Sequence, residues 1–407
     1  MLQLFRAAYR GYNNSYRGLS RPCWQRIGFT FTESIVETLI FFLTLYFVHD
    51  LHLRIDQAGL VMSAYGVGTA IGGFVGGKLS DKFTPGRISI IGLLFMSVGF
   101  FILGELHKTW QLMLCLALTG IAVYSFVTAN TVRIIDFCKD HSTQQKAISI
   151  NYAASNLGIG ISATVIGFVA DYSYHYLFYA ASVILIAAAI VMFLLERNKS
   201  TTFTHKSSTS AISNKIVHKK TWLGFVILIC LFLGGLIIAQ LSSTYPVYIR
   251  ATFPQYATQG VGLLFAINAI IIIIFQAPLS HIFHKINKVL MVGVGSFLMG
   301  FGMFLLNESF AYIVAVIACL FYTLGEMSFY STAQLVCYQQ GMAGRKGHSM
   351  GLFRSTYATC LIIGPAVGGW LYHHYSGHAV WTVAGAIGLV CLLICLIAKQ
   401  YYKPSSR

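Results

Sequence analysis

The sequence predicts an all-α membrane protein with twelve transmembrane helices in two pseudo-symmetric six-helix bundles. Three observations predict this class. The 407 residues are 56% hydrophobic and only 10% charged, whereas soluble domains are about one-quarter charged. Twelve apolar stretches of about 20 residues are each long enough to cross a hydrocarbon core of roughly 30 Å as a helix. One polar connection, between the sixth and seventh stretches, is longer than the others.

The spans follow one another in two sets of six. The first set is predicted at 28–49, 57–79, 87–106, 110–137, 146–171 and 175–196. The second set is predicted at 221–249, 258–282, 288–306, 310–338, 347–373 and 378–399. The chain therefore divides into a tail (1–27), a first bundle (28–196), a linker rich in Ser, Thr and Lys (197–220), a second bundle (221–399) and a tail (400–407).

The basic residues predict the orientation in the membrane. Lys and Arg near helix ends are retained on the cytoplasmic side, and only Arg54, Lys108 and Arg250 fall in loops on the other side. We therefore expect a multi-pass protein of the cytoplasmic (inner) membrane with both termini in the cytoplasm. The formal charge of +16 is spread over alternate short loops. Nucleic-acid binding, which needs basic residues gathered on one face, is not expected.

Small residues gather in two spans. The second span carries six glycines between positions 66 and 77, and the eleventh contains Gly364, Pro365, Gly368 and Gly369. Small residues at such spacings let helix backbones approach closely in lipid. We interpret these faces as surfaces on which the two halves move, with tight packing alone as the alternative. The segments 79–83 and 279–283 both begin with Leu-Ser, at an offset of 200, which favours two repeated halves.

The connection after the second span carries a recognisable motif. Residues 77–87 read Gly-Lys-Leu-Ser-Asp-Lys-Phe-Thr-Pro-Gly-Arg. This segment resembles the signature of the major facilitator superfamily, Gly-x-Leu-x-Asp-Arg-x-Gly-Arg-Arg/Lys. The glycine expected at position 84 is Thr, and the basic cluster that follows is reduced to Arg87.

The resemblance implies a cytoplasmic gate. In the family, the aspartate and basic residues of this loop pair with a carboxylate at the end of the fourth helix. Here the gate would comprise Gly77, Asp81 and Arg87, with Asp136 as the carboxylate and Arg133 assisting. Charges at such an interface can bias two packings by a few kcal/mol. The alternative is that they only anchor helix ends among lipid headgroups.

The pattern is most similar to the drug/proton antiporter-like branch of the superfamily. One departure concerns the direction of transport, because the Gly-Pro pattern that antiporters carry in the fifth helix appears here in the eleventh. The sequence Asn156-Leu157-Gly158 in the fifth span is also similar to proton-coupled oligopeptide carriers. Their first helix has two glutamates three apart followed by Arg, whereas Glu33 and Glu37 are four apart and Thr38 follows.

Glu33 and Glu37 are the candidate proton-coupling residues. They lie one turn apart on the first helix, roughly 8 and 14 Å from its predicted start at 1.5 Å per residue. Two carboxyl groups this close in a poorly solvated site cannot both be ionised cheaply, so we expect the pair to retain one proton that solvent or a cation can remove. The alternatives are a hydrated interfacial Glu33 and a purely structural Glu37.

Glu326 and Arg354 are a second candidate pair for proton coupling. They fall at similar depths on the tenth and eleventh helices, so we expect an ion pair between them. Breaking a buried pair is costly while forming it gains little, so it could act as a switch. A static pair that neutralises both charges is the alternative.

Polar and amphipathic residues within spans predict a substrate pocket. Aromatic faces with a carboxylate favour apolar and cationic solutes, although tyrosines in a span often only pack. The candidate substrate-binding residues are Tyr65, Asn130, Gln240, Tyr245, Asn268, Tyr322 and Tyr357.

These observations predict a proton-coupled secondary active transporter that works by alternating access and exports amphipathic or cationic compounds. The alternative is proton-coupled uptake of a peptide, siderophore or other polar metabolite. An enzyme is not expected, because the sequence has no His-Glu-x-x-His, nucleophile elbow or phosphate-binding loop. We expect a monomer in the lipid bilayer whose partners are a small-molecule substrate and protons, with no cofactor and no metal site.

Overall fold

The computed structural model describes residues 19–138, 141–197, 221–283, 286–308, 310–339 and 346–401. All regular elements among these residues are helical, as the sequence predicts. The predicted linker lies almost entirely outside the described residues, as do most of the two predicted tails.

The first half begins with a helix that changes from α to 3-10 geometry part-way across. Its elements are α2 (Arg21–Glu37), η1 (Thr38–Phe42), α3 (Leu43–Leu45) and η2 (Tyr46–Asp50), followed by α4 (Ile55–Lys82), α5 (Pro85–Leu103), α6 (Thr109–Asp136), α7 (His141–Val169) and α8 (Tyr174–Arg197). Helix α2 begins at Arg21, before the predicted start at 28, because Pro22 occupies the first turn, where a missing N–H costs nothing.

The second half repeats this order. Its elements are α9 (Thr221–Ala239), η3 (Gln240–Ser242), α10 (Thr244–Thr252), η4 (Pro254–Tyr256), α11 (Ala257–Phe283), α12 (Lys288–Phe304), η5 (Leu305–Glu308), α13 (Tyr312–Gln339), α14 (Lys346–Tyr375), α15 (Gly377–Ala398) and η7 (Lys399–Tyr401). Its first long helix is also interrupted part-way, at Gln240. The two interruptions meet, because Thr44 Oγ1 donates to the Ser242 carbonyl at 2.8 Å.

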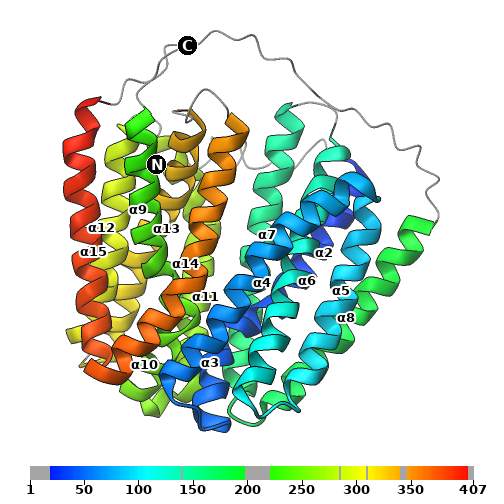
Figure 1. The fold of residues 1–407 in the computed structure, drawn as a ribbon, viewed down its shortest axis with the longest axis horizontal. Coiled ribbons are helices and arrows are strands. Elements are labelled where there is room, and N and C mark those ends of the chain that lie inside the picture. The colour runs from blue at the N-terminus through cyan, green and yellow to red at the C-terminus, as the bar shows by residue number, and fades with distance from the viewer. Residues whose placement is uncertain are drawn as a thin grey trace, which may run out of the picture.

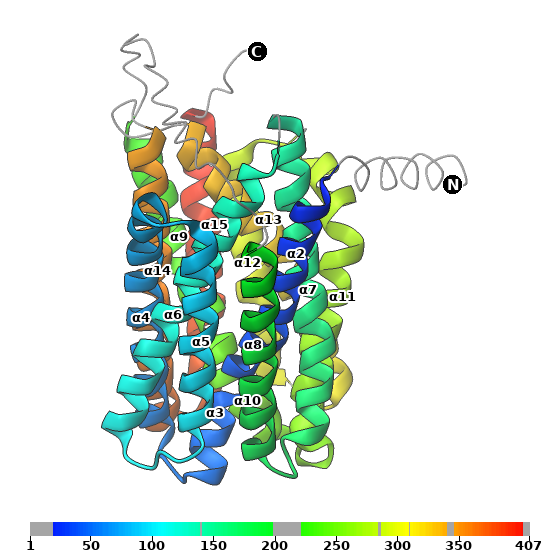
Figure 2. The ribbon, with the colours of Figure 1, turned by 90° about the vertical axis from the view of Figure 1, so that its right-hand side faces the viewer.

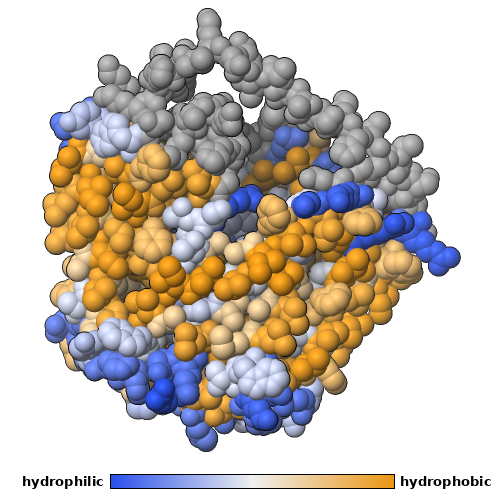
Figure 3. Space-filling model, in the orientation of Figure 1, coloured by the Kyte–Doolittle hydropathy of each residue, from blue (hydrophilic) through white to orange (hydrophobic). Residues whose placement is uncertain are grey.

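Eleven segments among the described residues are long and apolar enough to cross a membrane. A further long helix, α14, occupies the place of the span predicted at 347–373. Figure 3 shows apolar residues over the middle of the face that it presents, with polar residues gathered at the lower end. The helices thus present hydrocarbon-compatible surface along their length and polar surface at their ends.

The two halves stand side by side, with α2–α8 in one group and α9–α15 in the other (Figures 1 and 2). We call the face at which α2 begins and α15 ends the terminal face, and the other the opposite face. The groups diverge toward the terminal face (Figure 1).

Two helix pairs join the halves near the opposite face. In the pair α4 and α14, a methyl group on Gly59 would lie 2.3 Å from the Pro365 carbonyl oxygen, and one on Gly66 equally close to that of Leu361. In the pair α7 and α11, a methyl group on Gly167 would lie 3.1 Å from the Gly262 Cα. Only glycine permits such close backbones, which is the packing predicted for the second and eleventh spans.

Candidate transport site

Glu33 and Glu37 lie at the point where the first helix changes character. Glu37 is the last residue of α2, and the tighter segment η1 follows directly. The Glu33 side chain is buried, with 1% of the residue exposed, and its Oε1 has no hydrogen-bond partner. Glu37 Oε1 accepts a bond from the Tyr65 hydroxyl of α4 at 3.3 Å. The first half therefore holds two carboxyl groups in apolar surroundings, with one hydrogen bond between them and α4.

Glu326 lies in a hydrogen-bonded network between α11 and α13. Its Oε2 accepts from the Tyr322 hydroxyl at 2.9 Å and from Asn268 Nδ2 at 3.3 Å. The same Asn268 amide donates to Tyr322 at 3.2 Å and to Thr323 Oγ1 at 2.9 Å. The predicted residues Asn268 and Tyr322 are thus brought together around a carboxylate, which the sequence did not indicate.

The expected ion pair between Glu326 and Arg354 is not formed. Arg354 is exposed on α14, and it interacts electrostatically with Tyr124 and Tyr330. Glu326 is satisfied instead by neighbours on α11 and one turn away on α13. Equal depth in the membrane does not bring two side chains together when their helices turn these faces in different directions.

A group of tyrosines spans the space between the two carboxyl sites. In the second half, the rings of Tyr330 and Tyr357 meet edge to face at 5.0 Å. From the first half, Tyr124 interacts electrostatically with both Glu37 and Tyr330. Tyr152, of which 47% is exposed, interacts in the same way with Glu326 and Tyr330. Tyrosines of α6, α7, α13 and α14 therefore lie near the carboxyl groups of both halves.

Three members of this group were not predicted from the sequence. Tyr124, Tyr152 and Tyr330 fall within spans 110–137, 146–171 and 310–338, as the predicted Tyr65 and Tyr357 fall within theirs. The signal available in the sequence was that each of these tyrosines lies inside a predicted span. The sequence does not show which of its many tyrosines face the other half.

The predicted substrate-binding residues Asn130 and Gln240 each form hydrogen bonds within their own half. Asn130 Nδ2 donates to the Arg26 carbonyl at 3.0 Å and to Thr30 Oγ1 at 2.9 Å, tying α6 to α2. Gln240 Nε2 donates to the Gly364 carbonyl at 3.0 Å, and its side-chain oxygen accepts from Thr244 at 2.8 Å. Both amides are buried and bonded within their own half, where they satisfy polar groups in place of water.

Tyr245 is also enclosed by its neighbours. Only 3% of the residue is exposed, and its ring meets those of Phe265 and Trp381 edge to face at 6.0 and 6.3 Å. It contributes to the packing of α10 against α11 and α15.

The predicted gate is rearranged around a residue that the sequence analysis did not single out. Arg133 pairs with Glu196 Oε2 of α8 at 3.4 Å, and its guanidinium lies 4.6 Å from the Phe137 ring centroid. Glu196 also pairs with Arg26. Asp136, the carboxylate expected to pair with the loop residues Asp81 and Arg87, is exposed. The carboxylate that pairs with Arg133 is therefore Glu196, at the end of the sixth span.

Among the gate side chains that the structure describes, the remaining ones form no ion pair. Gly77 packs near Thr128 Cγ2, at 3.9 Å for a methyl group built on it. Arg87 is exposed and absent from the ion pairs between described residues. The side chain of Asp81 lies outside the part of the chain that the structure describes.

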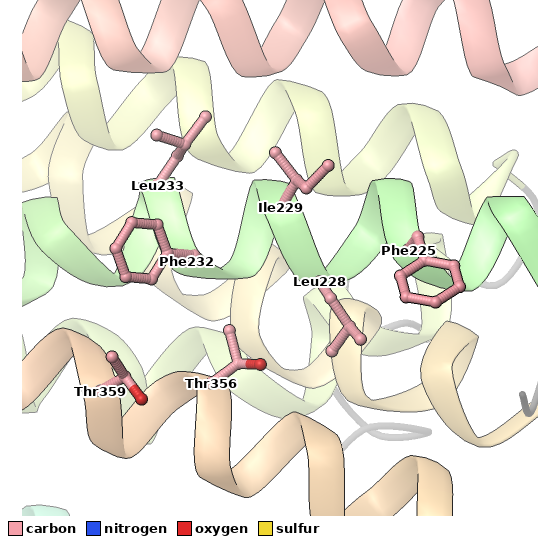
Figure 4. A pocket seen from close by; sticks show the side chains of 7 residues that line it. All are labelled: Phe225, Leu228, Ile229, Phe232, Leu233, Thr356 and Thr359. Carbon is pink, nitrogen blue, oxygen red and sulfur yellow. The ribbon is translucent and has the colours of Figure 1, made fainter.

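A groove of about 360 Å³ lies between α9 and α14 (Figure 4). Its lining is apolar except for Thr356 and Thr359. Phe225 and Ile229 are each 53% exposed, so this groove belongs to the outer surface of the bundle. It is separate from the carboxyl sites. Among the described residues, no cluster of three or more His, Cys, Asp or Glu side chains could hold a metal ion.

The family model for the major facilitator superfamily matches residues 27–359. The chain belongs to the major facilitator superfamily. It is a membrane transporter and not an enzyme, since its relatives and structural neighbours are all transporters.

Two curated relatives cover most of this major facilitator. An uncharacterised MFS-type transporter of Bacillus subtilis, YttB, is 24% identical over 361 residues, which are 87% of this chain and 88% of the relative. The quinolone resistance protein NorA of Staphylococcus aureus is 25% identical over 368 residues, which are 87% of this chain and 90% of NorA.

Solved structures share the fold. A mutant of the peptide transporter POT in complex with sulfate superposes with a TM-score of 0.80 at 17% identity, over 94% of this chain and 95% of that one. The nucleoside transporter NupG superposes with a TM-score of 0.74 at 14% identity, over 94% and 100%. At these identities the likeness establishes the fold.

Proposed function

We propose that this transporter is proton-coupled and exports small amphipathic or cationic compounds by alternating access across the cell membrane, with its terminal face in the cytoplasm. The observation that carries the proposal is Glu33, buried with a partnerless oxygen one turn from Glu37. A carboxylate oxygen without a hydrogen bond is unfavourable in such surroundings. The neutral acid is favoured until solvent reaches the pair, which gives it an exchangeable proton.

The position of the pair supports coupling between the proton and the movement of the halves. Glu37 ends α2 where the tighter segment η1 begins, and Tyr65 holds it to α4. Helix α4 is also one of the helices packed against the second half. A change in the charge of Glu37 therefore acts on a helix that must move when the halves rock.

The tyrosine group supports the substrate class. Tyr124, Tyr330 and Tyr357 offer ring faces between the carboxyl sites, and a cation is attracted to such faces, more strongly when it is desolvated. The carboxyl group of Glu326 lies near Tyr357, at one side of the group. The relative NorA is named for quinolone resistance, which agrees with export.

The alternative is proton-coupled uptake of a peptide, siderophore or other polar metabolite. The Glu326 network favours it, because Asn268, Tyr322 and Thr323 bring several hydrogen-bonding groups to one place. A polar solute can form hydrogen bonds with these groups. An amphipathic cation forms fewer hydrogen bonds of this kind.

Reconstitution into liposomes tests both functions. Under an imposed pH gradient, we expect wild-type protein to concentrate a lipophilic quaternary ammonium cation, and not a tripeptide, on the acidic side. Glu37→Gln should lose gradient-driven accumulation yet retain exchange of the cation between the two sides at equal pH, because binding and rocking remain.

The matched control is Glu105→Gln, which alters an exposed carboxylate bonded to Tyr179 at the opposite face and should leave accumulation unchanged. Normal coupling in Glu37→Gln would refute the proton assignment. Accumulation of the tripeptide instead of the cation would establish the alternative.

A further inference from the structure

One carboxylate at the opposite face joins the two halves directly. Asp171 lies in the turn between α7 and α8, in the first half. Its Oδ1 accepts from Thr258 Oγ1 at 2.6 Å and lies 3.3 Å from Arg250 Nη1, and its Oδ2 accepts from the Thr258 amide at 3.0 Å. Arg250 also donates to Thr258 Oγ1 at 2.9 Å. Both partners belong to the second half, so the three residues form one closed network across the interface.

The network provides a hydrogen-bond acceptor for the first turn of α11. Thr258 is the second residue of α11, and the first amides of a helix have no partner within it. The preceding Ala257 has no side-chain oxygen and a positive φ of 46°. The carboxylate of the other half therefore acts as the cap of α11, and a negative charge is favourable at a helix N-terminus.

From the network toward the middle of the molecule, α7 and α11 pack closely through small residues. A methyl group on Gly167 would lie 3.1 Å from the Gly262 Cα, and one on Gly160 would lie 2.8 Å from the Ala269 Cβ. These contacts are apolar and weakly directional. Of the ion pairs between described residues, only Arg250–Asp171 joins the halves. Between α7 and α11 the polar connection is therefore concentrated at Asp171, while elsewhere Thr44 also donates to the Ser242 carbonyl across the halves.

We propose that Asp171, Arg250 and Thr258 form a latch that holds the opposite face closed, so that opening toward this face requires the network to break. Separation of the halves there would withdraw Asp171 from the end of α11, leaving Thr258 uncapped and Arg250 without its partner. The latch thereby sets the fraction of molecules open toward the opposite face. It is independent of the proton assignment at Glu33 and Glu37.

The test measures the separation of the halves directly. Spin labels are attached through Lys108→Cys in the first half and Phe310→Cys in the second, both exposed positions in connections at the opposite face. Distances between the labels are recorded by double electron–electron resonance without a pH gradient. The native cysteines of the described residues are buried or half-buried, and protein lacking the two new cysteines serves as the labelling blank.

Wild-type protein should show mainly the short distance of the closed face. In Asp171→Asn, the population at longer distance should rise about fivefold, as expected for loss of a cap. Thr258→Val keeps the Asp171–Arg250 pair and the amide but loses the hydroxyl, and should give a smaller rise. Asp171→Glu should restore most of the closed population.

The control is Arg54→Gln, which breaks an exposed ion pair with Asp56 within the first half, at the same face, and should not change the distances. If Asp171→Asn does not fold, Thr258→Val decides the question. A distance distribution identical to wild type in folded Asp171→Asn or Thr258→Val would overturn the latch.

Discussion

In the first half, Glu33 and Glu37 share one face of α2, and Glu33 Oε1 has no hydrogen-bond partner. In the second half, Glu326 accepts two hydrogen bonds, from Tyr322 and Asn268. Hydrogen bonds to a carboxylate favour its charged form, while burial without them favours the neutral acid. Under the proposed function, we infer from this difference a division of labour, with a site for the proton in the first half and a site for the solute in the second.

A second contrast concerns how each half handles its basic residues. In the first half, Arg26 and Arg133 are buried, with 3% and 6% exposed, and share Glu196. In the second half, Arg354 is exposed and lies near tyrosines. Buried charges must be paired, whereas an exposed one remains available to a solute.

The largest expected effect is on the stability of the first half. Glu196→Gln removes the acidic side chain that pairs with both buried guanidinium groups among the described residues, so we expect a loss of about 2 to 4 kcal/mol of unfolding free energy, since uncompensated buried charge is costly. Thermal unfolding in detergent measures it. The control Asp56→Asn, which breaks the exposed pair with Arg54, should cost about 0.5 kcal/mol or less. Equal costs for the two variants would contradict the buried pairing.

Next in size is the effect on solute binding. Glu326→Gln should weaken binding of a quaternary ammonium cation by about tenfold, or about 1.4 kcal/mol, because one negative charge is lost beside the tyrosines. Equilibrium binding of the labelled cation measures it. The dependence of transport on a pH gradient should persist. Loss of that dependence with unchanged affinity would reverse the assignment of the two sites.

A smaller effect is expected from removing single hydroxyl groups. Tyr322→Phe and Tyr65→Phe each delete one bond to a carboxylate, and hydrogen bonds to charged groups are worth about 1.5 to 3 kcal/mol at most. Tyr322→Phe should lower cation affinity without altering the pH profile, while Tyr65→Phe should alter the pH profile at nearly unchanged affinity. The same response from both variants would show that the sites are not separate.

The smallest effect on rate should come from Glu33→Gln. Two coupled carboxyl groups release protons in two macroscopic steps that belong to the pair. Without Glu33, transport measured between acid and alkaline pH should change in a single step, with a maximal rate close to wild type. A two-step profile that survives the substitution would exclude Glu33 from the pair.

Several features of this chain could be predicted from its sequence alone. Apolar length and the sparse charges predict membrane-spanning helices, because a backbone in lipid must bond within its own helix. The motif at residues 77–87 indicates the family. The rarity of acidic residues within spans singles out Glu33, Glu37 and Glu326, since charge in hydrocarbon is costly.

The tertiary structure decided which polar groups meet. Equal depth suggested Glu326 with Arg354, but the structure pairs Glu326 with Tyr322 and Asn268, and Arg133 with Glu196. Asn130 and Gln240 turned out to bond within their own halves. A helix that is apolar on all sides carries no amphipathic stripe to report its rotation about its own axis. In lipid, that rotation is decided by close packing of small residues and by polar contacts between helices, which exist only in the assembled fold.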